Sequence, residues 1–286
     1  MNRLQFGPLA MLDQIRQKTE EQSNQKVATA DEPTSATSPA ESLLATDRNQ
    51  QGSTESTPSG LASILDQSSS VVHFNLFIPM NYEPNYSYPL IVYLHDRGQS
   101  ESRIHQTMPK LSCRNYAAIS VRSPGKLNSG GNDSNHPRMA WNQSDDVIEQ
   151  AQAAVCYAIK NAMNRLNINP DRVFLVGEGD GGTMALRLAF QNPEWFAGVA
   201  SLNGALPSEG TPFSRLNIAR DVPVFWCHYR QSQLFPEDSL CDGLSLLHTA
   251  GFNLTLRQYP NDDTGCNQVY SDLNHWVMEQ VTGSAS

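Results

Sequence analysis

The stretch from Val173 to Leu188 reads V-F-L-V-G-E-G-D-G-G-T-M-A-L-R-L. It opens with four apolar residues and no polar alternation, which is typical of a strand buried on both faces of a parallel sheet. A glycine-rich turn follows directly, and beyond it the apolar residues Met184, Ala185, Leu188 and Ala189 recur at helical spacing. The stretch therefore predicts a buried strand, a sharp turn and a helix.

The turn has the form of a nucleophile elbow, G-x-S-x-G. In that motif the glycines let strand and helix approach closely while the central residue projects from the bend. The frame here is Gly177-Glu178-Gly179-Asp180-Gly181, so the central position, Gly179, has no side chain. A frame with Asp180 as the nucleophile would place Glu178 where a small residue must pack, and we reject it. The sequence predicts an elbow without its nucleophile.

From about residue 61 onward, predicted strands alternate with predicted helices. This alternation predicts an α/β fold, a doubly wound and mostly parallel sheet with helices on both faces. One helix, over 145–166, has Asn142 or Ser144 as its candidate N-cap. The predicted strands cover residues 71–78, 90–94, 116–121, 173–176, 196–202, 221–228 and 253–259, and the remaining helices cover 102–109, 238–250 and 268–281.

Four runs of sequence match a known family: P-L-I-V-Y-L-H at 89–95, N-P-D-R-V-F-L-V-G at 169–177, G-G-T-M-A-L-R-L-A at 181–189 and P-E-W-F-A-G-V-A-S-L-N-G at 193–204. Through them, from about residue 71 to about 283, the chain resembles the α/β-hydrolase fold. Within that fold it resembles the phospholipase/carboxylesterase and dienelactone-hydrolase-like group. The resemblance is specific for the fold, and a fold alone says much less about activity.

The resemblance implies catalytic residues in the order nucleophile, acid and histidine, each placed after a strand. The run His228-Tyr-Arg-Gln-Ser232 places Ser232 at the acid's position, and a hydroxyl cannot hold an imidazolium's charge as a carboxylate does. The run Tyr259-Pro-Asn-Asp-Asp263 places Asp263 where the histidine is implied. An unperturbed aspartate has a pKa of about 3.9 and is a weak base. Gly179, Ser232 and Asp263 thus all depart from the family pattern, which argues against an ordinary serine hydrolase.

The loop after the strand at 90–94 reads His95-Asp96-Arg97-Gly98, where the resemblance implies His-Gly-x-Gly. By position, the backbone N–H groups of Arg97 and Asp180 match the donors of an oxyanion hole. The carboxylates expected around this pocket oppose the negative charge that such a hole stabilises. His95 matches a family position that orients the loop, and so does His228. The residues expected at the pocket are His95, Asp96, Glu178, Asp180, His228 and Asp263.

Other groups give weaker signals for catalysis. His275 is expected to pack within the last helix beside Trp276. Cys227 and His228 are adjacent on a predicted strand, so their side chains point to opposite faces, and Cys266 is a weak candidate thiol. The acidic residues lie on separate loops and fit no ligand-spacing motif for a hard cation. We therefore predict no metal and no cofactor.

Composition limits the partners and the compartment. A formal net charge of -9 and a pI near 5.2 argue against a nucleic-acid partner, which requires clustered Lys and Arg. The 5 cysteines are widely spaced and form no C-x-x-C pair, so we expect reduced thiols. No apolar run has the length of a signal peptide or of a membrane span, which takes about 20 residues. These features predict a cytoplasmic protein without a membrane span.

The sequence before the hydrolase-like region divides into two parts. Residues 1–18 are a candidate short amphipathic helix, interrupted near its start by Gly7 and Pro8. Residues 19–60 are polar and contain no aromatic side chain, which predicts disorder because they bury too little apolar surface. Residues 61–286 form the predicted domain.

Three functional hypotheses follow. The first is a pseudo-hydrolase that has lost catalysis and keeps its pocket for a small-molecule ester, a related ligand or a protein. The alternative is an active esterase or thioesterase that hydrolyses small carboxylic esters through water activated by Asp180 or Asp263. In the third, residues 1–17 are presented to a protein partner whose identity the sequence leaves open.

Overall fold

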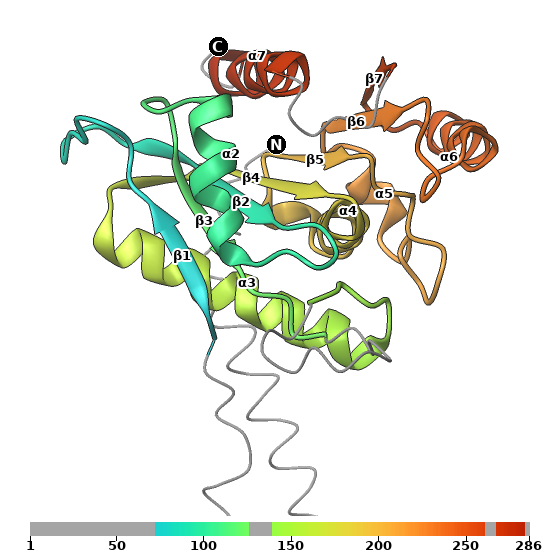
Figure 1. The fold of residues 1–286 in the computed structure, drawn as a ribbon, viewed down its shortest axis with the longest axis horizontal. Helices are drawn as coiled ribbons and strands as arrows, with labels where there is room; N and C mark the ends of the chain where they lie inside the picture. The colour runs from blue at the N-terminus through green and yellow to red at the C-terminus, as the bar shows by residue number, and fades with distance from the viewer. Residues whose placement is uncertain (1–71, 126–138, 261–266, 284–286) are drawn as a thin grey trace, which may run out of the picture. The chain divides into compact units, whose positions relative to one another are not determined.

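The computed structural model describes residues 72–125, 139–260 and 267–283, and these residues form a seven-stranded sheet (Figure 1). The strand order is β1-β3-β2-β4-β5-β6-β7. β1 pairs with β3 in the antiparallel direction, and the remaining pairs are parallel. The strands are β1 (Phe74–Phe77), β2 (Tyr88–Leu94), β3 (Ala117–Val121), β4 (Ile168–Glu178), β5 (Gly198–Leu202), β6 (Val224–Tyr229) and β7 (Leu254–Tyr259).

Helices cover both faces of the sheet. α2 and α7 pack together on one face, and α3 and α4 lie on the other (Figure 1). Gly243 of α6 approaches the ring of Trp226 on β6, which places α6 against the same face as α4. The helical segments are η2 (Glu101–Arg103), α2 (Ile104–Leu111), α3 (Asp145–Arg165), α4 (Asp180–Gln191), η3 (Pro193–Trp195), α5 (Leu216–Ala219), α6 (Glu237–Thr249) and α7 (Asn267–Gly283).

The central strands are buried along their whole length, as their continuous apolar runs predict. All residues of β2 and β3 are buried. Because side chains alternate along a strand, Tyr93, Phe174 and Val176 face α2 and α7, where they pack with Trp276. Each large apolar side chain buried in this way contributes about 1.5–3 kcal/mol. The sheet is thus a rigid support for the loops at the carboxyl ends of its strands.

Four details differ from the sequence expectations. β1 runs antiparallel at the edge of the sheet, and the four-residue helix α5 was not predicted. β4 begins at Ile168 rather than Val173, because Ile168 pairs with Tyr88 before a register shift. The N-cap residue of α3 is Ser144, but its side chain makes no capping hydrogen bond. The segments 1–18 and 19–60 lie outside the described residues.

Candidate functional site

The elbow between β4 and α4 is built as the glycine pattern predicts. Gly179 has φ 51° and ψ -120°, a conformation that residues with a Cβ adopt only under strain. A Cβ on Gly177 would lie 2.6 Å from the backbone nitrogen of Gly182, and one on Gly181 would lie 2.5 Å from the carbonyl oxygen of His95. The backbone thus keeps the bend that exposes a nucleophile, although position 179 has no nucleophile to expose.

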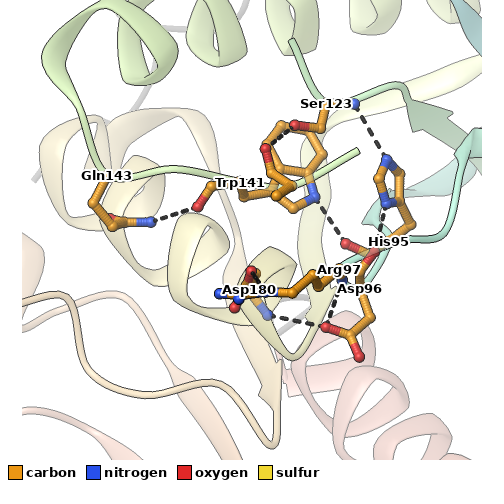
Figure 2. A network of polar contacts seen from close by, with 8 residues as sticks. His95, Asp96, Arg97, Ser123, Trp141, Gln143 and Asp180 are labelled. Carbon is orange, nitrogen blue, oxygen red and sulfur yellow. Dashed lines mark hydrogen bonds and ion pairs between the residues drawn. The ribbon is translucent and has the colours of Figure 1, made fainter. Parts of the chain in front are cut away.

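The carboxylate of Asp96 accepts hydrogen bonds from two backbone N–H groups beside the elbow (Figure 2). Its Oδ1 accepts a hydrogen bond from the backbone N–H of Arg97 at 2.7 Å and another from the backbone N–H of Asp180 at 3.2 Å. These are the two donors that the sequence assigns to the oxyanion hole. A Cβ on Gly179 would overlap the same oxygen and lie 2.5 Å from Asp96 Cγ. The Asp96 side chain therefore fills the space between the N–H groups of Arg97 and Asp180 and also the space beside Gly179.

An ion pair joins the two sides of this site. Arg97 Nε lies 2.6 Å from Asp180 Oδ2, and this hydrogen bond raises the pKa of Arg97 above its usual value. The side chain of Arg97 is 52% exposed and that of Asp180 is 25% exposed. Ion pairs at this exposure contribute little to stability. The pair does engage Oδ2 of the Asp180 carboxylate at the start of α4 in a hydrogen bond.

His95 holds the loop in place and is not available as a general base. Its Nδ1 donates to the backbone carbonyl of Asp96 at 2.8 Å, and its Nε2 accepts the N–H of Ser123 at 3.2 Å. The indole N–H of Trp141 donates to the His95 carbonyl at 2.8 Å (Figure 2). Burial lowers the pKa of His95 below its usual value. Both ring nitrogens of this neutral imidazole are already engaged.

His228 and Ser232 are likewise used by the loop that follows β6. His228 is fully buried, with Nε2 bonded to the carbonyl of Phe235 at 3.0 Å and Nδ1 near the amide of Gln258 at 3.3 Å. The hydroxyl of Ser232 accepts the N–H of Phe235 at 3.1 Å and the Asn203 amide at 2.9 Å. Ser232, which the resemblance predicts at the position of the family's acid, therefore stabilises a turn through its hydroxyl.

Glu178 lines the elbow pocket, but its carboxylate is directed into the apolar layer beneath. The residue is 3% exposed and accepts a hydrogen bond from the Tyr270 hydroxyl of α7. Burial raises the pKa of Glu178 above its usual value, although this hydrogen bond acts in the opposite direction. Tyr270 and its neighbour Tyr93 gave no signal in the sequence, because they lie far from the elbow along the chain and read as ordinary core residues.

The remaining candidates are placed as follows. The side chain of His275 is 80% exposed and lies 3.2 Å from Glu279, so the expectation that it packs within the domain is wrong. It sits on the outer side of α7. Cys227 belongs to the apolar cluster beneath α7, whereas His228 contacts Phe235 on the opposite side of β6. Asp263 and Cys266 lie outside the described residues.

The pocket at the elbow is small. Its volume is about 90 Å³, against the roughly 300–1,000 Å³ of sites that hold drug-sized ligands. The side chains of Asp96, Leu234 and Phe235 border the space above Gly179, which leaves room for a small group only. Its lining consists of Asp96, Glu178, Gly179, Asp180, Thr183, Leu202, Asn203, Gly204, Ala205, Tyr229, Leu234 and Phe235.

The described residues offer neither a metal site nor a membrane span. Within those residues, no three His, Cys, Asp or Glu side chains come together in a way that could hold a metal ion. No helix in the same part of the chain has the length and apolar character that crossing a bilayer requires.

The parallel sheet with an antiparallel edge strand, the helices on both faces and the elbow after β4 define an α/β-hydrolase fold. Within this class, the chain belongs to the phospholipase/carboxylesterase family, whose model matches residues 86–277. The sequence-based assignment of fold and family is thus confirmed.

Several relatives resemble the chain over part of their length. NocK of Nocardia uniformis subsp. tsuyamanensis, which carries an esterase name, is 30% identical over 53% of this chain and 42% of its own. A rice protein (Oryza sativa subsp. japonica) named "Probable inactive carboxylesterase Os04g0669700" is 26% identical over 46% of this chain and 54% of its own. The matches therefore span about half the length of these relatives.

Solved structures support the fold. The crystal structure of SOBER1 from Arabidopsis thaliana, which is named as a carboxylesterase, aligns with a TM-score of 0.57 at 18% identity. The alignment covers 68% of this chain and 100% of that one. The structure of acyl-protein thioesterase 2 from Zea mays aligns with a TM-score of 0.55 over 73% of this chain and 98% of its own, also at 18% identity. At this identity the likeness concerns the fold alone.

Proposed function

We propose that this chain is a pseudo-hydrolase, a family member that has lost ester hydrolysis and uses its pocket for binding. The observation that carries the proposal is the elbow itself, where Gly179 offers no nucleophile and the Asp96 carboxylate takes the oxyanion's place. Hydrolysis of an ester needs an attacking oxygen and donors that are free to receive the developing charge. Neither requirement is met at the elbow.

The alternative, water activated by Asp180, receives little support from the geometry. Oδ2 of the Asp180 carboxylate accepts a hydrogen bond from Arg97 Nε at 2.6 Å, so this oxygen is already engaged. The nearest histidine of the loop, His95, has both nitrogens engaged. Activation by Asp263, a protein partner for residues 1–17 and a cytoplasmic location stay predictions.

An ester panel tests the proposal. Purified full-length protein is incubated with short-chain p-nitrophenyl esters and, separately, with a fluorophosphonate probe that labels active serine nucleophiles. We expect hydrolysis at the rate of buffer and no labelling. We also expect Gly179→Ser to restore little, because neither Ser232 nor the engaged imidazole of His95 can activate the new hydroxyl. Clear turnover by the natural chain that Asp180→Asn abolishes would overturn the proposal in favour of the alternative.

A further inference from the structure

The oxyanion hole of this protein is complete in its backbone. Two N–H groups, from Arg97 in the loop after β2 and from Asp180 at the first position of α4, point at one oxygen atom. The second donor belongs to a helix of 12 residues, whose N-terminus carries a partial positive charge. Charge-assisted hydrogen bonds from backbone N–H groups to a carboxylate are among the stronger ones in proteins. The arrangement is therefore that of an occupied anion site.

The occupant belongs to the chain. Asp96 is attached to the same loop as one of the donors, so its carboxylate is always present at a high local concentration. An intramolecular ligand of this kind excludes free ligands of the same chemistry until it is removed. We propose that this cradle is a binding site for small carboxylates, which the protein keeps filled with the side chain of Asp96. The inference rests on the proposed function in treating the pocket as a binding site.

A second observation ties the occupant to the missing nucleophile. The Cβ of any residue at position 179 would overlap Asp96 Oδ1 and approach Cγ to 2.5 Å. Cβ atoms in proteins essentially never lie within 3.0 Å of a heavy atom outside their own residue and its chain neighbours. A side chain at position 179 therefore requires the Asp96 carboxyl group, which is the end of a side chain, to move out of the cradle.

Acetate serves as the probe for the free site. In Asp96→Ala the cradle is empty, so sodium acetate should raise the melting temperature saturably, relative to sodium chloride at equal ionic strength. It should also shift the amide NMR signals of Arg97 and Asp180. The natural chain should bind acetate at least about tenfold more weakly, because its own carboxylate competes. Asp96→Gly provides a second empty cradle if the alanine variant folds poorly.

Two control variants separate occupancy from charge. Asp96→Asn removes the charge but keeps an oxygen that can accept both hydrogen bonds, so we expect a smaller response to acetate than in Asp96→Ala. Asp171→Asn removes one charge from an exposed position at the opposite end of β4, and we expect it to behave as the natural chain does. An equal response of Asp96→Ala and the natural chain, or no shift of the two amide signals, would overturn the inference. None of these measurements depends on ester turnover, so the proposed function can fail separately.

A double-mutant cycle tests this steric conflict by stability alone. Gly179→Ser should lower the free energy of unfolding more in the natural chain than in Asp96→Ala, with a difference equivalent to about tenfold or more in the unfolding equilibrium constant. The strain at positive φ is present in both backgrounds and cancels. Gly251→Ser is the matched control, because Gly251 also has a positive φ of 77° but a Cβ there would meet none of the described residues within 4 Å. Additive effects of Asp96→Ala and Gly179→Ser would contradict the inference.

Discussion

A single carboxyl group, that of Glu178, is buried where the sheet meets α7. Burial raises its pKa, while the hydroxyls of Tyr270 and Tyr93 and the more distant charge of Arg103 partly counteract this shift. The Tyr270 hydroxyl donates to Oε1, whereas Oε2 has no hydrogen bond of good geometry among the described residues. Uncompensated charge in such surroundings is costly, so the protonated form is favoured here more than in water.

The ionisation of Glu178 should be visible in how the free energy of unfolding changes with pH. The folded pKa of Glu178 lies above the unfolded value of about 4.3. Stability from this group is therefore fully present below about pH 4.3 and is lost as the pH rises through the folded pKa, at about 1.4 kcal/mol for each pH unit between the unfolded and folded pKa values. Glu178→Gln keeps an acceptor for Tyr270 and should remove this loss.

Urea unfolding between pH 4 and pH 8 measures the effect. The free energy of unfolding of Glu178→Gln should rise relative to the natural chain as the pH increases. Glu149→Gln, at an exposed position on α3, is the control and should follow the natural chain at every pH. Parallel profiles for Glu178→Gln and the natural chain would contradict the prediction.

At the scale of elements, the elbow depends on the contact of α4 with β2. A Cβ on Gly181 would overlap the carbonyl oxygen of Leu94 and lie 2.5 Å from that of His95. Both neighbours are backbone atoms at the end of β2, so no side chain can move aside. The position therefore requires glycine for close approach, independently of any catalytic role.

Gly181→Ala should destabilise the protein by about 1–3 kcal/mol, the usual range for a group forced into a packed region. Gly283→Ala is the matched control, because a Cβ at that helix end would meet none of the described residues within 4 Å. Denaturant unfolding of the two variants gives the difference directly. Equal stability of both would mean that α4 shifts away from β2 without cost.

The elements were predictable to the extent that their signals are local. Fully buried strands such as β2 show as apolar runs, and α3 shows as an apolar stripe. The antiparallel direction of β1 could not be predicted from the sequence. The alternation of apolar and polar residues is the same for either strand direction, and the pairing with β3 is set by residues distant in sequence. In the site, the glycine motif predicted the bend at Gly179, but the position of the Asp96 carboxylate depends on the path of its loop.

At the scale of the whole molecule, the elements that the structure describes lie in the C-terminal part of the chain. All strand pairs described, and the apolar cluster beneath α2 and α7, lie between residues 72 and 283. The contacts between strands distant in sequence, such as β2 with β4, hold this part together. Stability should therefore reside in the sheet domain.

A chain that lacks residues 1–60 should unfold at the same temperature as the full-length protein, within about 2 °C, a shift equivalent to about 0.5–1 kcal/mol for a domain of this size. Circular dichroism at 222 nm during heating provides the measurement. The comparison also tests the predicted domain boundary at residue 61. A clearly lower melting temperature of the shorter chain would show that the removed residues contribute to the fold.

Asp96 and Gly179 also couple two mutations in evolution. A codon change that places serine at position 179 meets a carboxylate already in its space, and that carboxylate has to move before the hydroxyl fits. Replacement of Asp96 alone supplies no attacking group on which selection could act. For the proposed pseudo-hydrolase, a gain of ester hydrolysis therefore requires changes at both positions.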